Sequence, residues 1–368
     1  MKYYKLSALL SAFALLFALA ACEPEVSDPT GEPTQEASAN VNVPPTQEAT
    51  ASVPTETPSD GPDVTSGLEP AIRLAVLSGP TGIGAARLLD GADNNPISLH
   101  ADYTYHIFTD NSELVAGLTT GEIDIATMAS NMAVNLYNKT DGVKIIAGGT
   151  LGVLHILEGG GGTEINSVAD LEGKTIWSAG QGANPEYILR HLLRQSGLEA
   201  GVDVTVEFAD ASEISAKLLS GDIRYAMLPV PAATAAIAKG EGQVRAAIDV
   251  TGAWDELRSG SQLIMTAVVA RTEFVEEHPE LVDAFLADYE ESINYVKNNP
   301  DAAAELVAGY GLTPNAAIAK QAIPQCHLAF LSGSDMMSAM SDYFLTLYAI
   351  DPASVGGSLP DDGIYYVP

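Results

Sequence analysis

The chain has 368 residues, of which 48 are acidic and 17 are basic, so its formal net charge is −31 at pH 7. A charge this negative argues against nucleic acid as a partner, because nucleic-acid binding needs a basic footprint. It argues equally against direct docking on anionic lipid. The length is sufficient for two lobes with separate cores.

Residues 1–21 predict a lipoprotein signal peptide. The apolar run at 6–19 follows two lysines and is too short to span a bilayer as a helix, but it has the length of a signal core. The run ends in Leu-Ala-Ala-Cys at 19–22, and small residues before a cysteine are typical of bacterial lipoprotein signals. We therefore predict cleavage before Cys22 and lipidation of Cys22, which would anchor the protein to the cell membrane on its extracytoplasmic side. An ordinary secretory signal cut near Ala21 is the alternative.

The next segment, residues 22–70, predicts a lipidated N-terminus and a disordered tether. Residues 23–70 hold ten acidic residues and nine prolines but no lysine, arginine or aromatic residue. Such a composition cannot bury enough apolar surface to offset the entropy of the chain. Without the two lysines of the signal, the mature chain has 15 basic and 48 acidic residues, a net charge of −33.

Beyond residue 70, short apolar runs alternate with amphipathic helical patterns. We predict strands at 72–77, 123–128, 143–147, 151–158, 174–179, 203–209, 224–228, 244–250 and 262–270. From Pro279 to Ile350 the pattern is mainly helical. This alternation is typical of α/β proteins, in which crossover helices join parallel strands.

A repeated unit occurs in the chain with an offset of one hundred residues. DNSELVAGLTTGEIDIA at 110–126 matches DASEISAKLLSGDIRYA at 210–226 at eight of seventeen positions. In each copy a serine, Ser112 or Ser212, is the expected helix N-cap, and a glycine ends the helix where a positive φ is needed. The repeat predicts two lobes of related construction. Chance similarity between generic helix–turn–strand units is the alternative.

The repeat and the strand pattern together predict how the lobes divide the chain. Two segments, 150–158 and 262–270, lie where the chain would cross between lobes. The predicted fold class is α/β, with two α/β lobes joined by a two-segment hinge. Lobe I comprises 71–155 plus 268–368, and lobe II comprises 156–267.

The candidate ligand-binding residues follow from the predicted strand ends. In open α/β sheets, ligands bind beyond the carboxyl ends of strands and near helix N-termini. Four such loops occur, two in each lobe, so we expect them to face one another across a cleft. Their residues are Ser78, Gly79, Pro80, Thr81, Ser130, Asn131, Ser178, Gln181, Gly182, Ala183, Asn184, Pro229, Val230 and Pro231.

The loop after the strand at 174–179 predicts an anion site. Asn184 is a strong candidate for a helix N-cap, and Pro185 suits the first helical position. Gly180 and Gly182 free the backbone, so that N–H groups can point at a carboxylate, a sulfonate or a similar anion. A tight strand-to-helix turn that needs glycine for steric reasons alone is the alternative. The loop lacks the third glycine of a dinucleotide fingerprint.

Patterns typical of catalysis or metal binding do not stand out in the sequence. The six histidines are scattered without metal-like spacing, and no Gly-x-Ser-x-Gly elbow occurs. With Cys22 lipidated, Cys326 is left unpaired, which predicts a small core residue rather than a nucleophile. We therefore predict no catalytic residue, no metal and no cofactor.

Several segments of the sequence resemble the solute-binding proteins of ABC importers. The resemblance is to the nitrate/sulfonate/taurine branch, including its pyrimidine-precursor-like members. The resemblance covers nearly all of 71–368. It rests on the segments SGPTGIG, LxxGEIDIA, TLGVLHILE, LEGKTIWSAGQGANPEYIL and EEHPELVDAFLADYEESINYV, of which the fourth is the most specific. It implies a type II periplasmic-binding-protein-like fold that closes on one small-molecule solute and delivers it, as a monomer, to ABC permease subunits. The predicted strand-end loops coincide with those that line the cleft in this family.

The resemblance leaves the ligand and two other classes of function open. No arginine or lysine lies in the candidate loops, which weakens a strongly charged dianion and leaves a monoanion or a neutral heterocycle. One alternative is an enzyme on the same fold, like the fungal pyrimidine synthase of thiamine biosynthesis or the menaquinone-pathway dehydratases. That synthase type carries a cysteine-rich motif, whereas Cys326 stands alone. The other alternative is a ligand-sensing lipoprotein.

Overall fold

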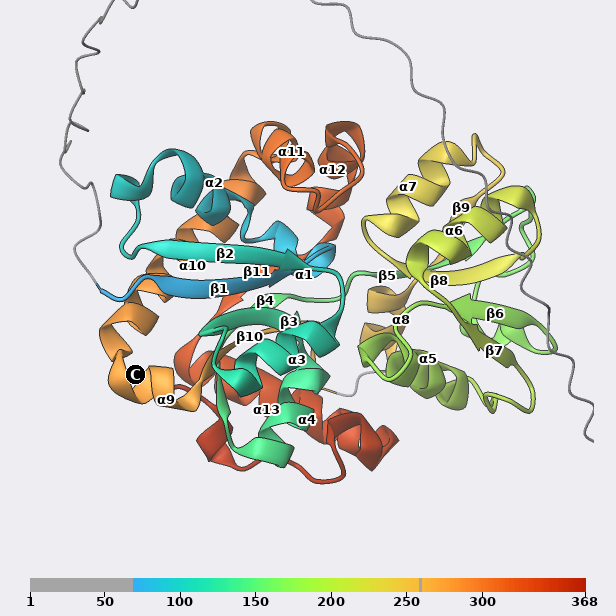
Figure 1. The fold of residues 1–368 in the computed structure, drawn as a ribbon. Helices are drawn as coiled ribbons and strands as arrows, with labels where there is room; N and C mark the ends of the chain where they lie inside the picture. Colours follow the sequence, from blue (N-terminus) through green and yellow to red (C-terminus); the bar gives the residue numbers. More distant parts are fainter. Residues whose placement is uncertain (1–68, 258–259) are drawn as a thin grey trace, which may run out of the picture. The chain divides into compact units, whose positions relative to one another are not determined.

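The computed structural model describes residues 69–257 and 260–368 (Figure 1). The predicted signal peptide, Cys22 and the predicted tether up to residue 68 lie outside the described residues. In the part of the chain that is described, no helix combines the length and the apolar character that crossing a membrane requires. The described elements form two β-sheets with helices packed on their faces.

The first sheet has the strand order β11-β4-β10-β3-β1-β2. Its strands are β1 (Ile72–Leu77), β2 (Tyr103–Phe108), β3 (Ile125–Ala129), β4 (Val143–Thr150), β10 (Thr266–Arg271) and β11 (Leu328–Leu331). Strand β1 pairs in parallel with β2 and β3. Strand β10 runs antiparallel to both β3 and β4, and β11 runs antiparallel to β4.

Helices cover both faces of the first sheet (Figure 1). They are α1 (Pro80–Ile83), α2 (Ala86–Asn94), α3 (Asn111–Thr120), α4 (Ser130–Thr140), α9 (Thr272–Glu277), α10 (Pro279–Asn298), α11 (Pro300–Gly309), α12 (Ala316–Ala322) and α13 (Gly333–Ile350). In β1, Leu74 and Val76 join the apolar cluster of α2, α10, α11 and α12, whereas Ala75 and Leu77 join that of α3, α4 and α13. This is the period-two alternation of a strand buried on both faces.

The second sheet has the strand order β7-β6-β8-β5-β9. Its strands are β5 (Leu154–Glu158), β6 (Thr175–Ser178), β7 (Thr205–Phe208), β8 (Tyr225–Pro229) and β9 (Arg245–Asp249). Its helices are α5 (Asn184–Gln195), α6 (Ala211–Ser220), α7 (Ala232–Lys239) and α8 (Val250–Glu256). Residues of α6 and α7 pack on one face and residues of α5 and α8 on the other.

The short 3₁₀ segments are η1 (Pro96–Ser98), η2 (Val168–Leu171), η3 (Ile323–Gln325), η4 (Pro352–Val355) and η5 (Asp362–Ile364).

The two sheets share one construction. Each sheet contains three neighbouring parallel strands, in the orders β2-β1-β3 and β7-β6-β8. In both sets, the strand in the middle is the one that comes first in the sequence. In each, the strand that arrives from the other sheet, β10 or β5, is inserted antiparallel beside the trio. The predicted α/β fold class and the two lobes of related construction are confirmed.

The repeated sequence unit forms α3 with β3 in one lobe and α6 with β8 in the other. The predicted helix ends are confirmed, because Gly121 and Gly221 adopt left-handed conformations with φ of 77° and 83°. The predicted N-caps are wrong: the caps are Asp110 and Asp210, each two residues before the serine. Only the first has a side-chain cap, in which the Asp110 carboxylate accepts from the N–H of Ser112 (2.7 Å).

The chain crosses between the sheets at 151–153 and again between α8 and β10, where residues 260–265 are described. The boundaries predicted from the sequence, 155/156 and 267/268, each fall inside a strand. A strand belongs to the sheet with which it makes its hydrogen bonds, so all of β5 lies in the second lobe and all of β10 in the first. The strand pattern also missed β2 and β11, the latter in a stretch predicted to be mainly helical.

Candidate ligand-binding cavity

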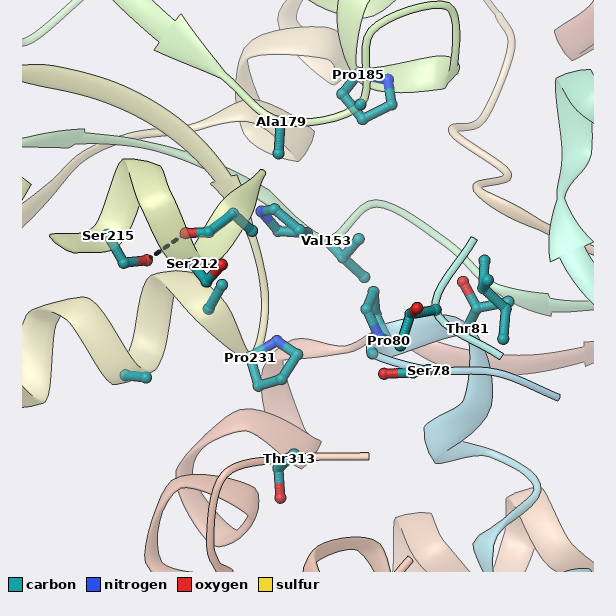
Figure 2. Close-up of a pocket in the computed structure, with 18 of the residues that line it drawn as sticks. Ser78, Pro80, Thr81, Val153, Ala179, Pro185, Ser212, Ser215, Pro231 and Thr313 are labelled. Atoms are coloured by element: carbon teal, nitrogen blue, oxygen red, sulfur yellow. Dashed lines mark hydrogen bonds between the residues drawn. The ribbon is translucent and has the colours of Figure 1, made fainter. Parts of the chain in front are cut away.

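A cavity of about 760 Å³ lies at the carboxyl ends of the parallel strands of both sheets (Figure 2). The loops after β1, β6 and β8 contribute to its wall, as do Ala129 at the end of β3 and the loop 311–314 between α11 and α12. The crossing segments contribute Val153 and Met265, and α6 and α7 supply the wall on the second lobe. Figure 2 shows Ser78, Pro80 and Thr81 from the first lobe and Ser212 and Ser215 from the second on different sides of the cavity.

The loop after β1 depends on glycine. Gly79 has φ 85° and ψ −151°, a region that only glycine adopts without strain. At Gly82 a Cβ would lie 2.5 Å from the carbonyl oxygen of Leu77, which no side chain could tolerate. The loop therefore turns sharply enough to place Ser78 and Thr81 in the cavity wall.

Eight predicted site residues line this cavity, namely Ser78, Gly79, Pro80, Thr81, Ala183, Asn184, Pro229 and Pro231. Six lie outside the lining, namely Ser130, Asn131, Ser178, Gln181, Gly182 and Val230. Gln181 and Gly182 are exposed, and Val230 is buried in an apolar cluster of the first lobe. Ser178 donates its hydroxyl to the carbonyl of the next residue (3.0 Å).

Ser130 and Asn131 are buried because they join the two lobes. The Oδ1 atom of Asn131, on α4, accepts from the N–H of Asn184, on α5 (3.2 Å), and its Nδ2 donates to the carbonyl of Ser354 (3.2 Å). The Nδ2 atom of Asn184 donates to Oγ of Ser130 (3.0 Å) and to the carbonyl of Met265 (3.1 Å). The N-termini of α4 and α5 are thus hydrogen-bonded to each other beside the cavity.

The N-terminus of α5 is occupied by groups of the protein itself. Its N-cap is Ala183, without a side-chain cap bond, and not Asn184 as predicted, because Asn184 is used in the inter-lobe network. The N–H of Gly182 donates to Oε2 of Glu186 (2.9 Å), so a carboxylate already faces the positive end of the helix dipole. The geometry favours the alternative in which the glycines serve the turn: Gly180 and Gly182 have φ of 83° and 72°.

Sequence reasoning missed other polar residues of the lining, namely Thr109, Asn111, Ser212, Ser215, Lys239, Thr266 and Thr313. The repeat held a usable signal for two of them, because Asn111 and Ser212 lie at the helix starts that follow β2 and β7. No signal pointed to Thr313, which lies in a loop between two helices far along the chain.

The cavity wall is mainly apolar and carries little charge. Among the described residues that line it, Lys239 is the only one with a charged side chain, and none is a histidine, cysteine, tyrosine, aspartate or glutamate. Two lining residues, Asn184 and Thr266, are each about 1% exposed, and their Oδ1 and Oγ1 atoms have no hydrogen-bond partner. The wall can therefore hold a small molecule and offer it hydrogen bonds, but it has few groups for proton transfer.

Outside the cavity, the described residues include one cysteine, Cys326. Cys326 is buried, as predicted for a core residue, and burial raises the pKa of its thiol to about 12. A thiol with that pKa remains protonated at neutral pH and is a poor nucleophile. Within 69–257 and 260–368, no three histidine, cysteine, aspartate or glutamate residues are grouped so that they could hold a metal ion.

The fold and the cavity place the chain among proteins with the periplasmic-binding-protein fold. An ABC transporter structure from Parabacteroides distasonis matches with a TM-score of 0.67 and 24% identity, covering 82% of this chain and 99% of that one. The periplasmic aliphatic sulphonate binding protein SsuA from Escherichia coli matches with a TM-score of 0.63 and 16% identity, covering 78% and 91%. A Candida albicans gene product with the generic periplasmic binding protein fold matches with a TM-score of 0.54 and 13% identity, covering 80% and 94%.

The chain belongs to the NMT1/THI5-like family, whose model matches residues 109–303. This stretch runs from the end of β2 through the whole second lobe and into α11. No curated protein matches the sequence.

Proposed function

We propose that this protein is the extracytoplasmic solute-binding component of an ABC importer, which captures one small molecule in its cavity and passes it unchanged to the permease. The observation that carries the proposal is the cavity wall. It is built from both lobes and combines apolar surface with hydroxyl groups, and its described lining holds no histidine, cysteine or carboxylate. Such a site is suited to binding rather than to acid–base or nucleophilic chemistry.

The structural relatives support this role. The Parabacteroides distasonis protein is described as an ABC transporter and the Escherichia coli protein as a periplasmic aliphatic sulphonate binding protein. An enzyme on the same fold is the competing function. It would need a reacting group beside the cavity, and in the described lining only the exposed Lys239 carries an ionisable side chain.

Solute capture works by closure of the two lobes about the crossing segments at 151–153 and 260–265. A monomer is sufficient for this motion, because both walls of the cavity come from one chain. The lining of the first lobe comes mainly from strand-end loops, and that of the second includes exposed positions of α6 such as Ser212 and Leu219. Closure would remove these exposed groups from water.

Membrane attachment through Cys22 is part of the same proposal. An acyl anchor followed by a long acidic tether would keep the binding lobes near the permease and so raise their effective concentration there. The test is Cys22→Ser in the full chain, followed by separation of membrane and soluble fractions. We expect the variant to move to the soluble fraction, and equal membrane retention would contradict lipidation at this position.

The binding function is tested by thermal unfolding of the purified chain with nitrate, bicarbonate, benzoate, cytosine, hexane-1-sulfonate and hexanamide. A bound solute stabilises the folded state by about 2.7 kcal/mol at one hundred times its dissociation constant. Recovery of the solute unchanged supports a transport receptor, whereas its conversion would favour the enzyme.

Two variants on α7 locate the site. Ala232 lines the cavity, and Ala238 is an exposed residue of the same helix outside the lining. We expect Ala232→Phe to remove the stabilisation by the solute and Ala238→Phe to preserve it. Equal effects of the two substitutions would place the solute elsewhere.

A further inference from the structure

The cavity has an arm that runs along the second lobe between α6 and α7. The lining of α6 includes Ser212, Ser215, Ala216 and Leu219, and that of α7 runs at the same spacing from Ala232 to Lys239. Positions separated by three, four and seven residues share one face of a helix, so each helix turns a single face to the arm. From Ala232 to Lys239 this face is about 10 Å long.

The arm starts at the strand ends and leads away from them. Strands β7 and β8 are both parallel to β6, and α6 and α7 each begin just after one of them. Both helices therefore run in the same direction from the carboxyl ends of the strands. Leu219 and Lys239, near the C-terminal ends of the two helices, form the outer end of the arm.

The arm is apolar along most of its length. The hydroxyl of Ser215 donates to the carbonyl of Ala211 (2.7 Å), so its proton is used within α6. Leu219 is 38% exposed. The aliphatic stem of Lys239 can lie along apolar surface while its ammonium group stays in water. A solute segment in the arm would therefore contact methyl and methylene groups, and it would cover Leu219 from water.

The wall of the first lobe offers free hydroxyl groups. Ser78 and Thr81 line the cavity after β1 (Figure 2). Among the described residues neither hydroxyl has a hydrogen-bond partner, and neither oxygen belongs to the unpartnered atoms that are shielded from solvent. Both oxygens are therefore accessible. A hydroxyl donates and accepts, so this pair suits the polar group of a neutral solute or of an anion.

We infer that the solute is an amphiphile, with a polar head at Ser78 and Thr81 and an unbranched aliphatic tail that lies along the arm as far as Leu219. This inference rests on the proposed binding function and adds a tail subsite to it. The described lining has no aromatic side chain on which a ring could stack, which favours an aliphatic tail. The other candidate occupant of the arm is the first lobe, whose loop 311–314 lines the same cavity. If closure filled the arm with that loop, the length of a tail would not affect affinity.

Two series of probes test the tail subsite. Isothermal titration calorimetry of the purified chain measures dissociation constants for butane-, hexane- and octane-1-sulfonate and for butanamide, hexanamide and octanamide. In at least one series we expect the dissociation constant to fall about two- to fourfold for each added methylene, fourfold being the effect of full burial. The two series distinguish an anionic head from a neutral one.

The outcomes separate this inference from the binding function. Binding that does not depend on chain length would overturn the tail subsite and leave the binding function intact. Binding of neither series would also overturn the tail subsite. The binding function fails separately, if the wider panel of solutes gives no stabilisation and the denatured protein releases no small molecule in mass spectrometry.

Three variants test where the tail and the head lie. Ala216 is exposed and lines the arm, whereas Ala238 is exposed on α7 outside the lining. We expect Ala216→Phe to remove the dependence on chain length and Ala238→Phe to preserve it. Ser78→Ala should instead raise the dissociation constants at every chain length by one factor, about fivefold for one lost hydrogen bond. An unchanged dependence on chain length in Ala216→Phe would overturn the place of the tail, and unchanged constants in Ser78→Ala would overturn that of the head.

Discussion

At the scale of single residues, the second lobe is held at one end by a buried carboxylate. Glu158, at the end of β5, is fully buried and accepts from the N–H of Glu164 (2.9 Å) and from the guanidinium of Arg245 (2.7 Å). Burial alone would raise the pKa of Glu158, but the hydrogen bonds from Glu164 and Arg245 outweigh it and hold the pKa below its ordinary value. The folded state therefore prefers the ionised carboxylate.

The lowered pKa of Glu158 predicts how the stability lost in Glu158→Gln depends on pH. A carboxyl whose pKa is lowered on folding stabilises the protein above its unfolded pKa of about 4.3, and that stability is lost as pH falls through the folded pKa. We expect the variant to lose about 3 kcal/mol at pH 7, as for a broken buried ion pair, and much less at pH 3. Urea unfolding at both pH values measures the two differences. The exposed Glu207→Gln on β7 is the control, expected within about 0.5 kcal/mol of the parent.

Backbone strain at the cavity rim gives a second prediction. A Cβ atom at Gly79 would meet no other atom within 4 Å. The substitution Gly79→Ala therefore tests the cost of φ 85° and ψ −151° without steric contact. We expect a loss of about 1–3 kcal/mol in the free energy of unfolding. Gly309, the last residue of α11, also has open space but lacks a positive φ, so Gly309→Ala should be neutral or stabilising. Similar losses in both variants would show that strain does not set the conformation of this loop.

At the scale of elements, the repeat offers two matched helices with different caps. The Asp110 carboxylate accepts from both N and Oγ of Ser112, whereas Asp210 has no side-chain cap bond at the start of α6. We expect Asp110→Ala to lower the free energy of unfolding by about 1 kcal/mol and Asp210→Ala to lower it clearly less. Denaturant unfolding of both variants measures the difference. Equal losses would mean that a general charge effect at the helix N-terminus, rather than the cap bond, stabilises α3.

Elements with a strong local signal were predicted well from the sequence. The apolar run at 72–77 is β1 with the predicted ends, and both repeat helices end at the predicted glycines. The N-caps were misplaced by two residues because serine and aspartate are both good caps, and only the folded backbone decides which oxygen reaches a free N–H. Strand β11, four residues between helical segments, is extended because it pairs with β4, a contact far away in the sequence.

The candidate site was predicted in part for a related reason. Strand ends locate the loops, so Ser78, Thr81 and Pro231 were found to line the cavity. Sequence alone could not show that Asn131 is used to hold Asn184, because that contact joins helices of different lobes. Nor could it show the lining positions on α6 and α7, since they depend on how the lobes face each other.

At the scale of the whole molecule, the two lobes share apolar packing as well as a cavity. One apolar cluster includes residues of both sheets, and Trp254 of α8 is fully buried within it. The ring of Trp254 lies 6.1 Å from that of Tyr343, on α13 of the first lobe, and 5.2 Å from that of His191, on α5. The lobes are therefore expected to unfold together, because neither can lose its core without exposing part of the other.

Calorimetry of the purified chain tests this coupling, with one transition expected for the parent. Trp254→Ala should lower the stability by about 3–5 kcal/mol, the usual cost of removing a large buried side chain. The chain's other tryptophan, Trp177 on β6, is half-buried in the second lobe with the ammonium of Lys217 3.9 Å above its ring, so Trp177→Ala should cost less. If Trp254→Ala split the transition in two while Trp177→Ala did not, Trp254 would be the residue that couples the lobes. Two transitions in the parent would instead contradict the coupling of the lobes through the shared core.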